Sequence, residues 1–370
     1  MQASELPTIT AQLLLAGFAL SALFGAIAQR THFCTMGAVS DVVNMGDWTR
    51  MRQWGMAAGV AMIGFGAMAY AGWIDPAKTL YASHRWMWLS ALTGGLMFGF
   101  GMVLASGCGS KTLVRVGAGN LKSLIVMVVL GLAAFATLKG ITAVLRVDTV
   151  DRVAVDIVTG VSLPQMFAAL TGAKLAVTGL WLGLALGGAL VVWALMGENF
   201  RNVENVLAGL GIGAVIVLAW WLSGHFGHLQ EHPETLQEAF LATNSGRAEA
   251  LSFVAPIAYS LDWLMFFSDK SKVLTLGIVS VAGVIAGSAV VALATGAFRW
   301  EGFGGTEDVA NHLVGATLMG VGGVTAMGCT IGQGLSGIST LSATSLVAVC
   351  AILAGSVAAF KYQVWRLDRA

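Results

Sequence analysis

The sequence predicts an all-α, polytopic membrane protein, with about nine helices that cross the bilayer and several short helices that do not. Of its 370 residues, 57% are hydrophobic and 11% are charged, whereas a soluble domain carries about 25% charged residues. The mean hydropathy is +0.80. Several apolar runs are about 20 residues long, which is enough to span a bilayer. These runs are continuous, whereas the strands of a membrane β-barrel alternate in hydrophobicity.

Charge and glycine content narrow the possible functions. The formal net charge is +1, so no basic excess points to a nucleic-acid partner. The 48 glycines favour close helix packing and interrupted helices within lipid. Residues 1–6 contain no Lys or Arg ahead of the first apolar run. A signal peptide begins with a basic region, so we expect this run to be a retained helix.

In the first half of the chain, four apolar runs are long enough to cross the membrane: 10–28, 54–74, 86–106 and 121–144. The intervening run, 31–48, has arginines at both edges. This flanking charge predicts a short helix that enters and leaves on one side of the bilayer. Trp86 and Trp88 are expected to anchor the third run at the interface. That run leads to Cys108 and then into a predicted break that extends to about Asn120.

The second half repeats this arrangement after a polar connection at 146–172, which we expect to lie at the surface. Five further runs are predicted to cross: 174–196, 203–222, 273–294, 312–328 and 341–360. Residues 253–267 form another run too short to cross comfortably. The longest polar stretch, 225–249, contains His225, His228 and His232. In such a polar loop these histidines are predicted to be solvated side chains and not metal ligands.

Two landmarks recur at nearly equal spacing and indicate an inverted repeat. Phe33 and Phe253 are 220 positions apart, and Cys108 and Cys329 are 221 apart. Each half reads as a span, a short helix, two spans, a Gly-Cys break and a final span, with one extra helix between the halves. An odd number of crossings inverts one half relative to the other, which is a common transporter plan. We therefore divide the single membrane domain into a first repeat (1–145), a connecting segment with the extra helix (146–200) and a second repeat (201–370).

The distribution of basic residues gives a weak orientation. With the N-terminus outside, 11 of the 20 Lys and Arg residues lie inside: Arg30, Arg50, Arg52, Lys111, Arg115, Lys122, Arg201, Arg299, Lys361, Arg366 and Arg369. Cytoplasmic loops carry an excess of these residues. We therefore expect a periplasmic N-terminus and a cytoplasmic C-terminus.

Both Gly-Cys motifs follow apolar runs, in Gly107-Cys108-Gly109-Ser110-Lys111 and in Gly328-Cys329-Thr330-Ile331-Gly332-Gln333-Gly334. Breaks inside a membrane persist only where they are buried in protein or line a polar cavity. Amides freed at the start of the next helix attract anions, and flanking glycines allow close approach to the backbone. Lys111 adds positive charge, and Gln333 adds a neutral amide. Thiols are polarizable and weak donors, so they favour a soft, sulfur-bearing anion.

Metal binding and disulfide chemistry are alternative roles for the cysteines. They are isolated from one another, and no Cys-x-x-Cys occurs, so no metal site and no cofactor are predicted. A membrane thiol-disulfide oxidoreductase needs an adjacent resolving cysteine, and the sequence shows no local pair. It remains an alternative, as does a structural subunit in which the breaks merely pack. Cys350 is expected to be a packing residue.

At Arg30-Thr31-His32-Phe33-Cys34, at Gly99 to Cys108 and at Gly328 to Gly334, the chain resembles the YeeE/YedE family of sulfur-transport membrane proteins, in particular its thiosulfate-importer branch. The resemblance implies an hourglass-like, pseudo-symmetric fold in which three cysteines hand thiosulfate inward through S–H···S contacts. Carried over, these are Cys34, Cys108 and Cys329, while Cys350 matches none of them. The resemblance also implies a small cytoplasmic TusA-like sulfur-carrier partner. Some relatives are associated with selenium or other sulfur species.

These observations lead to the hypothesis of a non-enzymatic transporter in the bacterial inner membrane that imports thiosulfate or a similar anion. Its partners are that anion, the lipid bilayer and the sulfur carrier, with no nucleic acid. The path is predicted to contain Cys34, Cys108, Cys329, Gly107, Gly109, Lys111, Gly328, Gly332 and Gln333.

Overall fold

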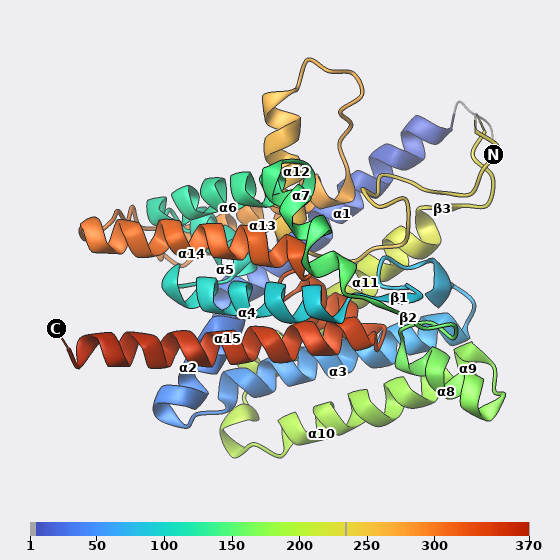
Figure 1. Ribbon diagram of the computed structural model, residues 1–370, viewed down its shortest axis with the longest axis horizontal. Helices are drawn as coiled ribbons and strands as arrows, with labels where there is room; N and C mark the ends of the chain where they lie inside the picture. Colours follow the sequence, from blue (N-terminus) through green and yellow to red (C-terminus); the bar gives the residue numbers. More distant parts are fainter. Residues whose placement is uncertain (1–4, 234, 370) are drawn as a thin grey trace.

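The computed structural model describes residues 5–233 and 235–369, and its long elements are all helices (Figure 1). The prediction that no signal peptide precedes the first helix rests on residues 1–6, of which 1–4 lie outside the described residues. The long helices are α1 (Leu6–Arg30), α3 (Thr49–Tyr70), α4 (Trp88–Leu104), α6 (Leu121–Lys139), α11 (Val203–Trp221), α13 (Leu276–Ala294), α14 (Thr306–Thr325) and α15 (Ala343–Leu367). Helices α9 (Leu175–Leu182) and α10 (Gly188–Leu195) join through one π-helical stretch, Gly183–Gly187.

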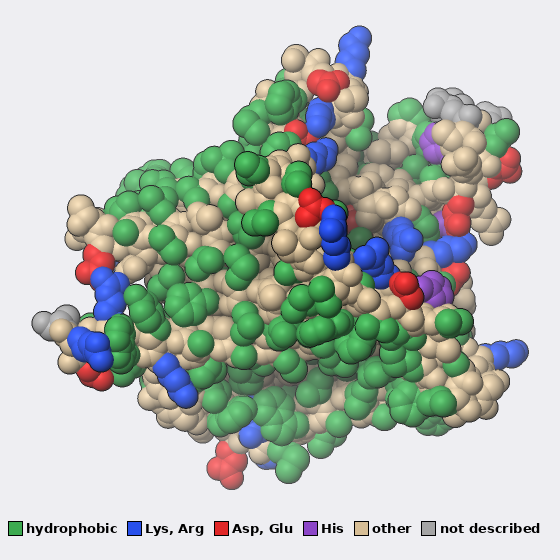
Figure 2. All heavy atoms as spheres, viewed as in Figure 1, with side chains coloured by type: hydrophobic (Ala, Val, Ile, Leu, Met, Phe, Trp, Pro, Cys, Tyr) green, Lys and Arg blue, Asp and Glu red, His purple; other side chains and the backbone are tan. Residues whose placement is uncertain are grey.

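Seven helical stretches in the described part of the chain are long and apolar enough to cross a membrane. The space-filling view shows hydrophobic side chains over the middle of the visible face and charged ones mainly toward its two ends and on the connection after α12 (Val254–Met265) (Figure 2). The prediction of an all-α, multi-pass membrane protein is confirmed at this level. Helices α3 and α14 have 22 and 20 residues but are less apolar, and the first turn of α14 contains Glu307 and Asp308.

The remaining elements are short. They are the helices α2 (Thr35–Met45), α5 (Gly109–Gly117), α7 (Ile141–Asp148), α8 (Leu163–Thr171) and α12, and the antiparallel strand pairs β1 (Arg85–Trp86) with β2 (Val155–Asp156) and β3 (His228–Leu229) with β4 (Ala239–Phe240). Helices α2 and α12 are the two short helices predicted within 31–48 and 253–267. Helix α2 ends at Gly46, whose φ of 68° is the left-handed cap that glycine favours.

Several predicted boundaries are wrong. The break after Cys108 was expected to extend to Asn120, but the backbone is helical again from Gly109 as α5. The predicted span 121–144 ends at Lys139, because the extended backbone of Gly140 separates α6 from α7. Helix α14 begins at Thr306, because acidic residues are favourable in a first turn even though they lower hydropathy. Helix α15 continues to Leu367.

Helices α4 and α14, which lead to the two Gly-Cys motifs, cross at pairs of glycines. A Cβ atom added at Gly94 would lie 2.7 Å from the Gly322 carbonyl oxygen, and one added at Gly101 would lie 2.6 Å from the Gly315 oxygen. The reverse substitutions at Gly322 and Gly315 meet the Gly94 and Gly101 oxygens at 2.6 Å in each case. The two backbones therefore approach more closely than any side chain would permit, as small residues allow in membrane helices.

The connection at 146–172 is not only a surface loop, because part of it forms backbone hydrogen bonds with the second half of the chain. The Leu163 N–H donates to the Leu341 carbonyl oxygen at 3.0 Å, and the Ala343 N–H donates to the Val161 oxygen at 3.0 Å. Ser162 also caps α8 through a reciprocal capping box with Gln165. These bonds fix the connection to the chain that leads from the second Gly-Cys motif into α15.

Candidate functional site

The two Gly-Cys motifs adopt the same backbone turn. Helix α4 ends with Gly107 N–H bonded to the Met102 oxygen at 2.8 Å, and α14 ends with Gly328 N–H bonded to the Gly323 oxygen at 2.7 Å. Each turn places a non-glycine residue in the left-handed region, with Ser106 at φ 56° and Met327 at φ 57°. Such residues are uncommon there. The following cysteine therefore leaves the helix axis in the same manner in both halves.

Three thiols from separate segments meet at the centre of the protein. Cys34 precedes α2, Cys108 precedes α5, and Cys329 precedes the π-helical stretch Gly332–Gly337. Cys108 and Cys329 are 0% exposed, and Cys34 is 7% exposed. The side chains of Cys34 and Cys108 lie near enough to interact with each other, and Cys329 is close enough to Cys108 to interact electrostatically. The structure thus brings together the three cysteines that the sequence singled out.

Each thiol is held by its own segment. The Cys34 sulfur accepts from the Gly37 N–H at 3.4 Å, and the Cys329 sulfur accepts from the Gly332 N–H at 3.4 Å. The Cys108 sulfur lies 3.3 Å from the Ser110 hydroxyl. Sulfur is a weak acceptor, so these bonds orient the thiols and leave them open to a further contact.

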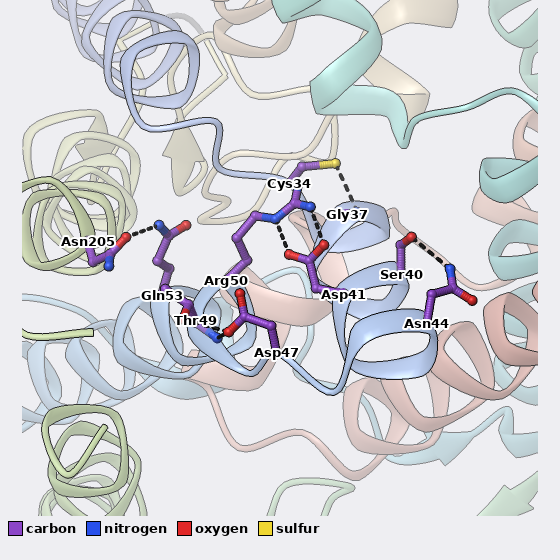
Figure 3. Close-up of polar contacts among 10 residues, drawn as sticks. All are labelled: Cys34, Gly37, Ser40, Asp41, Asn44, Asp47, Thr49, Arg50, Gln53 and Asn205. Atoms are coloured by element: carbon purple, nitrogen blue, oxygen red, sulfur yellow. Dashed lines mark hydrogen bonds and ion pairs between the residues drawn. The ribbon is translucent and has the colours of Figure 1, made fainter. Parts of the chain in front are cut away.

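A group of cations lies on the α2–α5 side of the thiols. The Lys111 ammonium interacts electrostatically with Cys34 and Cys108, and also with Arg115 and Arg50. Arg115 donates from Nη1 to the Ser106 carbonyl oxygen at 2.7 Å, which ties it to the Gly-Cys turn. Arg50 binds the buried Asp41 through two hydrogen bonds (Figure 3). Lys111 has no carboxylate partner among the described residues, so this side of the thiols suits an anion.

Arg50, a basic residue at the edge of the short helix and one of those expected inside, lies close to the thiols without having been a predicted site residue. The guanidinium lies against Gly37, where an added Cβ would be 2.2 Å from Nη1. The same Gly37 N–H donates to the Cys34 sulfur (Figure 3). Arg50 therefore reaches the α2 start from α3, nine positions beyond Asp41. Two features of the sequence could have identified Arg50: it is a charged residue in the first turn of a membrane helix, and the carboxylate of Asp41 lies in the short helix just before it.

A cavity of about 270 Å³ opens on the other side of the thiols and reaches Gly328, immediately before Cys329. Its wall includes one cation, Arg146, and several uncharged polar residues: Ser21, Tyr81, Asn244, Ser245, Ser252, Tyr259 and Ser280. Glu249 also lines it. Burial raises the pKa of the Glu249 carboxyl, which accepts from the Asn244 N–H at 3.1 Å and the Ser245 hydroxyl at 3.0 Å.

The other predicted path residues have different surroundings. Gly332 packs closely against Ser252, whose hydroxyl oxygen would lie 2.6 Å from an added Cβ. Gly107 and Gly109 have no neighbour closer than 3.4 Å at that position. Both ends of the buried Gln333 amide are hydrogen-bonded, since its nitrogen donates to the Ala326 oxygen at 2.7 Å and its oxygen accepts from the Ser345 hydroxyl at 2.6 Å. It therefore fixes the segment after Cys329.

The remaining candidates lie outside this centre. Cys350, expected to pack between helices, is instead exposed on α15. His228 pairs with Glu238 at 2.6 Å, and His225 lies 3.2 Å from the Trp73 oxygen. In residues 5–233 and 235–369, no group of three or more His, Cys, Asp or Glu side chains is arranged to hold a metal ion.

A helical membrane protein with buried thiols between an anion-sized cavity and a cluster of cations has the features of a transporter for a soft anion. The sulphur transport family model matches residues 30–358, and the chain belongs to this family. It is 26% identical over 337 residues to the thiosulfate transporter TsuA of Escherichia coli (strain K12), covering 87% of each protein. It is 25% identical over 358 residues to the thiosulfate transporter TsuA of Spirochaeta thermophila, covering 93% of this chain and 96% of that protein.

Proposed function

We propose that this protein imports thiosulfate or a closely similar sulfur anion across the bacterial inner membrane, through a path lined by Cys34, Cys108 and Cys329. The observation that carries the proposal is the meeting of these three thiols between a cavity that contains Arg146 and several hydroxyl groups on one side and a cluster of cations on the other. The two relatives named as thiosulfate transporters support the choice of substrate.

Entry would begin in the 270 Å³ cavity, which lies outside if the N-terminus is periplasmic. Arg146 supplies positive charge there and attracts anions into a site with low-dielectric walls. The carboxyl of Glu249 would repel an anion when ionised, but its hydrogen-bonded donors and its raised pKa reduce that effect. The cavity ends at Gly328, so the anion would meet Cys329 next.

Passage would then depend on successive weak contacts between the terminal sulfur of the anion and the three thiols. Several weak sites allow an ion to bind without being trapped, as conduction requires. Lys111 and the neighbouring arginines would draw the anion toward the cytoplasmic side. A small TusA-like sulfur carrier is the proposed acceptor there. No covalent intermediate is required by this sequence of contacts.

The same proposal includes nine crossings arranged as an inverted repeat. The seven apolar stretches, together with α3 and α14, make up the nine. The reciprocal glycine contacts support the repeat: Gly94 and Gly315 are 221 positions apart, as are Gly101 and Gly322, and each pair exchanges contacts with the other. The proposed units remain 1–145, 146–200 and 201–370.

Labelled thiosulfate uptake into proteoliposomes tests the function. Cys34→Ala, Cys108→Ala and Cys329→Ala should each lower uptake severely, whereas Cys350→Ala, at an exposed thiol of α15, is the matched control and should transport normally. Excess sulfate should compete poorly because it has no bare sulfur, and selenite tests the alternative of a selenium substrate. Normal uptake in all three cysteine variants would refute the thiol path.

A membrane thiol-disulfide oxidoreductase is the second candidate, because the side chains of Cys34 and Cys108 lie near enough to interact. That function requires a reversible disulfide between them. Alkylation and mass measurement before and after mild oxidation would detect it. A disulfide that forms on oxidation and is needed for activity would favour the enzyme over the transporter.

A further inference from the structure

Among the described residues, the wall of the large cavity contains a single carboxyl group, that of Glu249. Its two oxygens accept hydrogen bonds from the Asn244 N–H at 3.1 Å and from the Ser245 hydroxyl at 3.0 Å. None of the ion pairs formed within residues 5–233 and 235–369 includes Glu249. An ionised carboxylate without a counter-charge disfavours a second negative charge nearby. Its place on the path of an anion therefore calls for an explanation.

Hydrogen bonds to other segments fix Glu249 at the cavity. The Leu80 N–H donates to the Ala248 carbonyl oxygen at 2.9 Å, and the Ala248 N–H donates to the Lys78 oxygen at 3.1 Å. The Ser223 hydroxyl donates to the Glu249 carbonyl oxygen at 2.5 Å and accepts from the Glu249 N–H at 3.1 Å. The backbone of Glu249 is therefore tied on both sides, and its carboxyl stays at the cavity wall.

Glu249 also lies near the inner end of the cavity, where the path reaches the thiols. Tyr81 lines the same cavity, and its hydroxyl donates to the Gly332 carbonyl oxygen. The Gly332 N–H in turn donates to the Cys329 sulfur at 3.4 Å. Tyr81 is close enough to both Glu249 and Cys329 for their charges to act on its hydroxyl. An anion that moves from the cavity to Cys329 therefore passes close to the Glu249 carboxyl.

The other titratable groups around Glu249 are neutral or have partners. The charge of Glu249 reaches the hydroxyl of Tyr259 on α12, which like Tyr81 is a neutral phenol at physiological pH. Three cations on neighbouring segments are engaged elsewhere: Arg146 pairs with Asp151 at 3.2 Å, Lys78 pairs with Glu238 at 2.5 Å, and Arg247 donates to the Ala82 oxygen at 2.8 Å. Burial therefore raises the pKa of the Glu249 carboxyl, against the lowering effect of its two hydrogen bonds. The protonated fraction grows as pH falls toward this raised value.

The surroundings of Glu249 accommodate both protonation states. In the ionised state, both oxygens accept the hydrogen bonds given above. In the neutral acid, Oε1 still accepts from the Asn244 N–H while Oε2 carries the proton. The Ser245 hydroxyl also lies 3.4 Å from the Arg247 carbonyl oxygen, to which it can donate instead. The proton on Oε2 is then free to point into the cavity.

We propose that Glu249 binds the transported anion in its protonated form: the neutral acid donates a hydrogen bond to an oxygen of the anion, and the ionised carboxylate repels the anion. This inference rests on the proposed function and adds a proton to its first binding step. The proton stays on the carboxyl oxygen, so no covalent bond to the anion forms. The proton and the anion therefore strengthen each other's binding by the same factor.

Labelled thiosulfate uptake into proteoliposomes, with the same pH on both sides, tests the proposal from about pH 5 to about pH 8, above the ordinary pKa of a glutamate. Thiosulfate stays fully ionised over this range, so the substrate does not change. In the wild-type protein, the thiosulfate concentration for half-maximal uptake should rise with pH by about tenfold, within the usual range for coupling between two ligands. Glu249→Gln keeps a neutral donor at the same place, so its half-saturation should stay near the acid wild-type value at every pH.

Glu231→Gln is the matched control, because Glu231 is an exposed carboxylate of the same connection and does not line the cavity. It should keep the wild-type pH profile. Ser245→Ala removes a donor that stabilises the ionised carboxylate, so the rise in half-saturation should move to higher pH. This variant provides the test if Glu249→Gln does not yield monodisperse protein.

A rise with pH that persists unchanged in Glu249→Gln, or a Ser245→Ala profile that does not move, would overturn the role of Glu249 and leave thiosulfate transport intact. A wild-type half-saturation that does not vary with pH would do the same. A wild-type protein that moves no thiosulfate at any pH would overturn the proposed function, and this inference with it.

Discussion

The crossing of α4 and α14 makes a quantitative prediction for Gly101→Ala. The new Cβ would lie 2.6 Å from the Gly315 oxygen, so the helices must separate by about 0.8 Å to reach an ordinary contact of 3.4 Å. The other near atoms, Leu318 Cβ at 2.8 Å and the Met319 nitrogen at 2.9 Å, are also fixed by the helix backbone, so no flexible side-chain end can move aside. Overpacking of this kind costs about 1–3 kcal/mol. The separation also moves the two turns that hold Cys108 and Cys329.

Thermal unfolding in detergent and thiosulfate uptake would measure the two consequences. Gly188→Ala is the matched control: Gly188 begins α10 with helical backbone and an added Cβ meets nothing within 4 Å. It should be neutral or stabilising by up to about 1 kcal/mol, since alanine favours the helix. We expect Gly101→Ala to be less stable than Gly188→Ala and to transport less. Equal stability and equal uptake in the two variants would refute the reasoning from backbone contact.

Two further predictions concern charged groups. Asp41→Asn should destabilise the protein by about 3 kcal/mol in thermal unfolding, because Asp41 is 3% exposed and its loss leaves Arg50 without its counter-charge; an unchanged midpoint would contradict this. The hydrogen bond from Lys78 holds the pKa of Glu238 below its ordinary value. Its contribution is present above the unfolded-state pKa of about 4.3 and is lost as pH falls through the lowered folded-state pKa. Hydrogen exchange at residues 228–233 and 235–240 should therefore rise toward that of Glu238→Gln only in acid, and equal exchange in the two proteins at neutral pH would contradict the assignment.

Much of the fold follows from the sequence because lipid restricts the choices. Continuous apolar runs in a bilayer become helices, so α1, α11 and α13 lie where hydropathy placed them. Hydropathy predicts helix positions less well where a helix packs inside the protein. Helix α14 begins six residues before the predicted start, since Glu307 and Asp308 open it. The polarity of 109–117 suggested a break, although α5 buries Leu113 and Val114 on one side.

The thiols could be predicted, but not the groups that surround them. A Gly-Cys pair after an apolar run is visible as a motif, and its recurrence identifies it. Gln333 was expected to face an anion, and only the coordinates show its amide bonded to Ala326 and Ser345.

The two backbone hydrogen bonds between residues 161–163 and 341–343 have a consequence for how the chain can be divided. They form a short seam that belongs to the connection and to the start of α15 equally. A nick before residue 161 would leave that seam on the C-terminal fragment alone, whereas a nick at the exposed residues 172–174 would leave half of it on each fragment. After a nick at 172–174, one fragment would carry residues 161–163 and the other residues 341–343, and these two segments can hydrogen-bond to each other. The connection would therefore help the two fragments to assemble into the membrane domain.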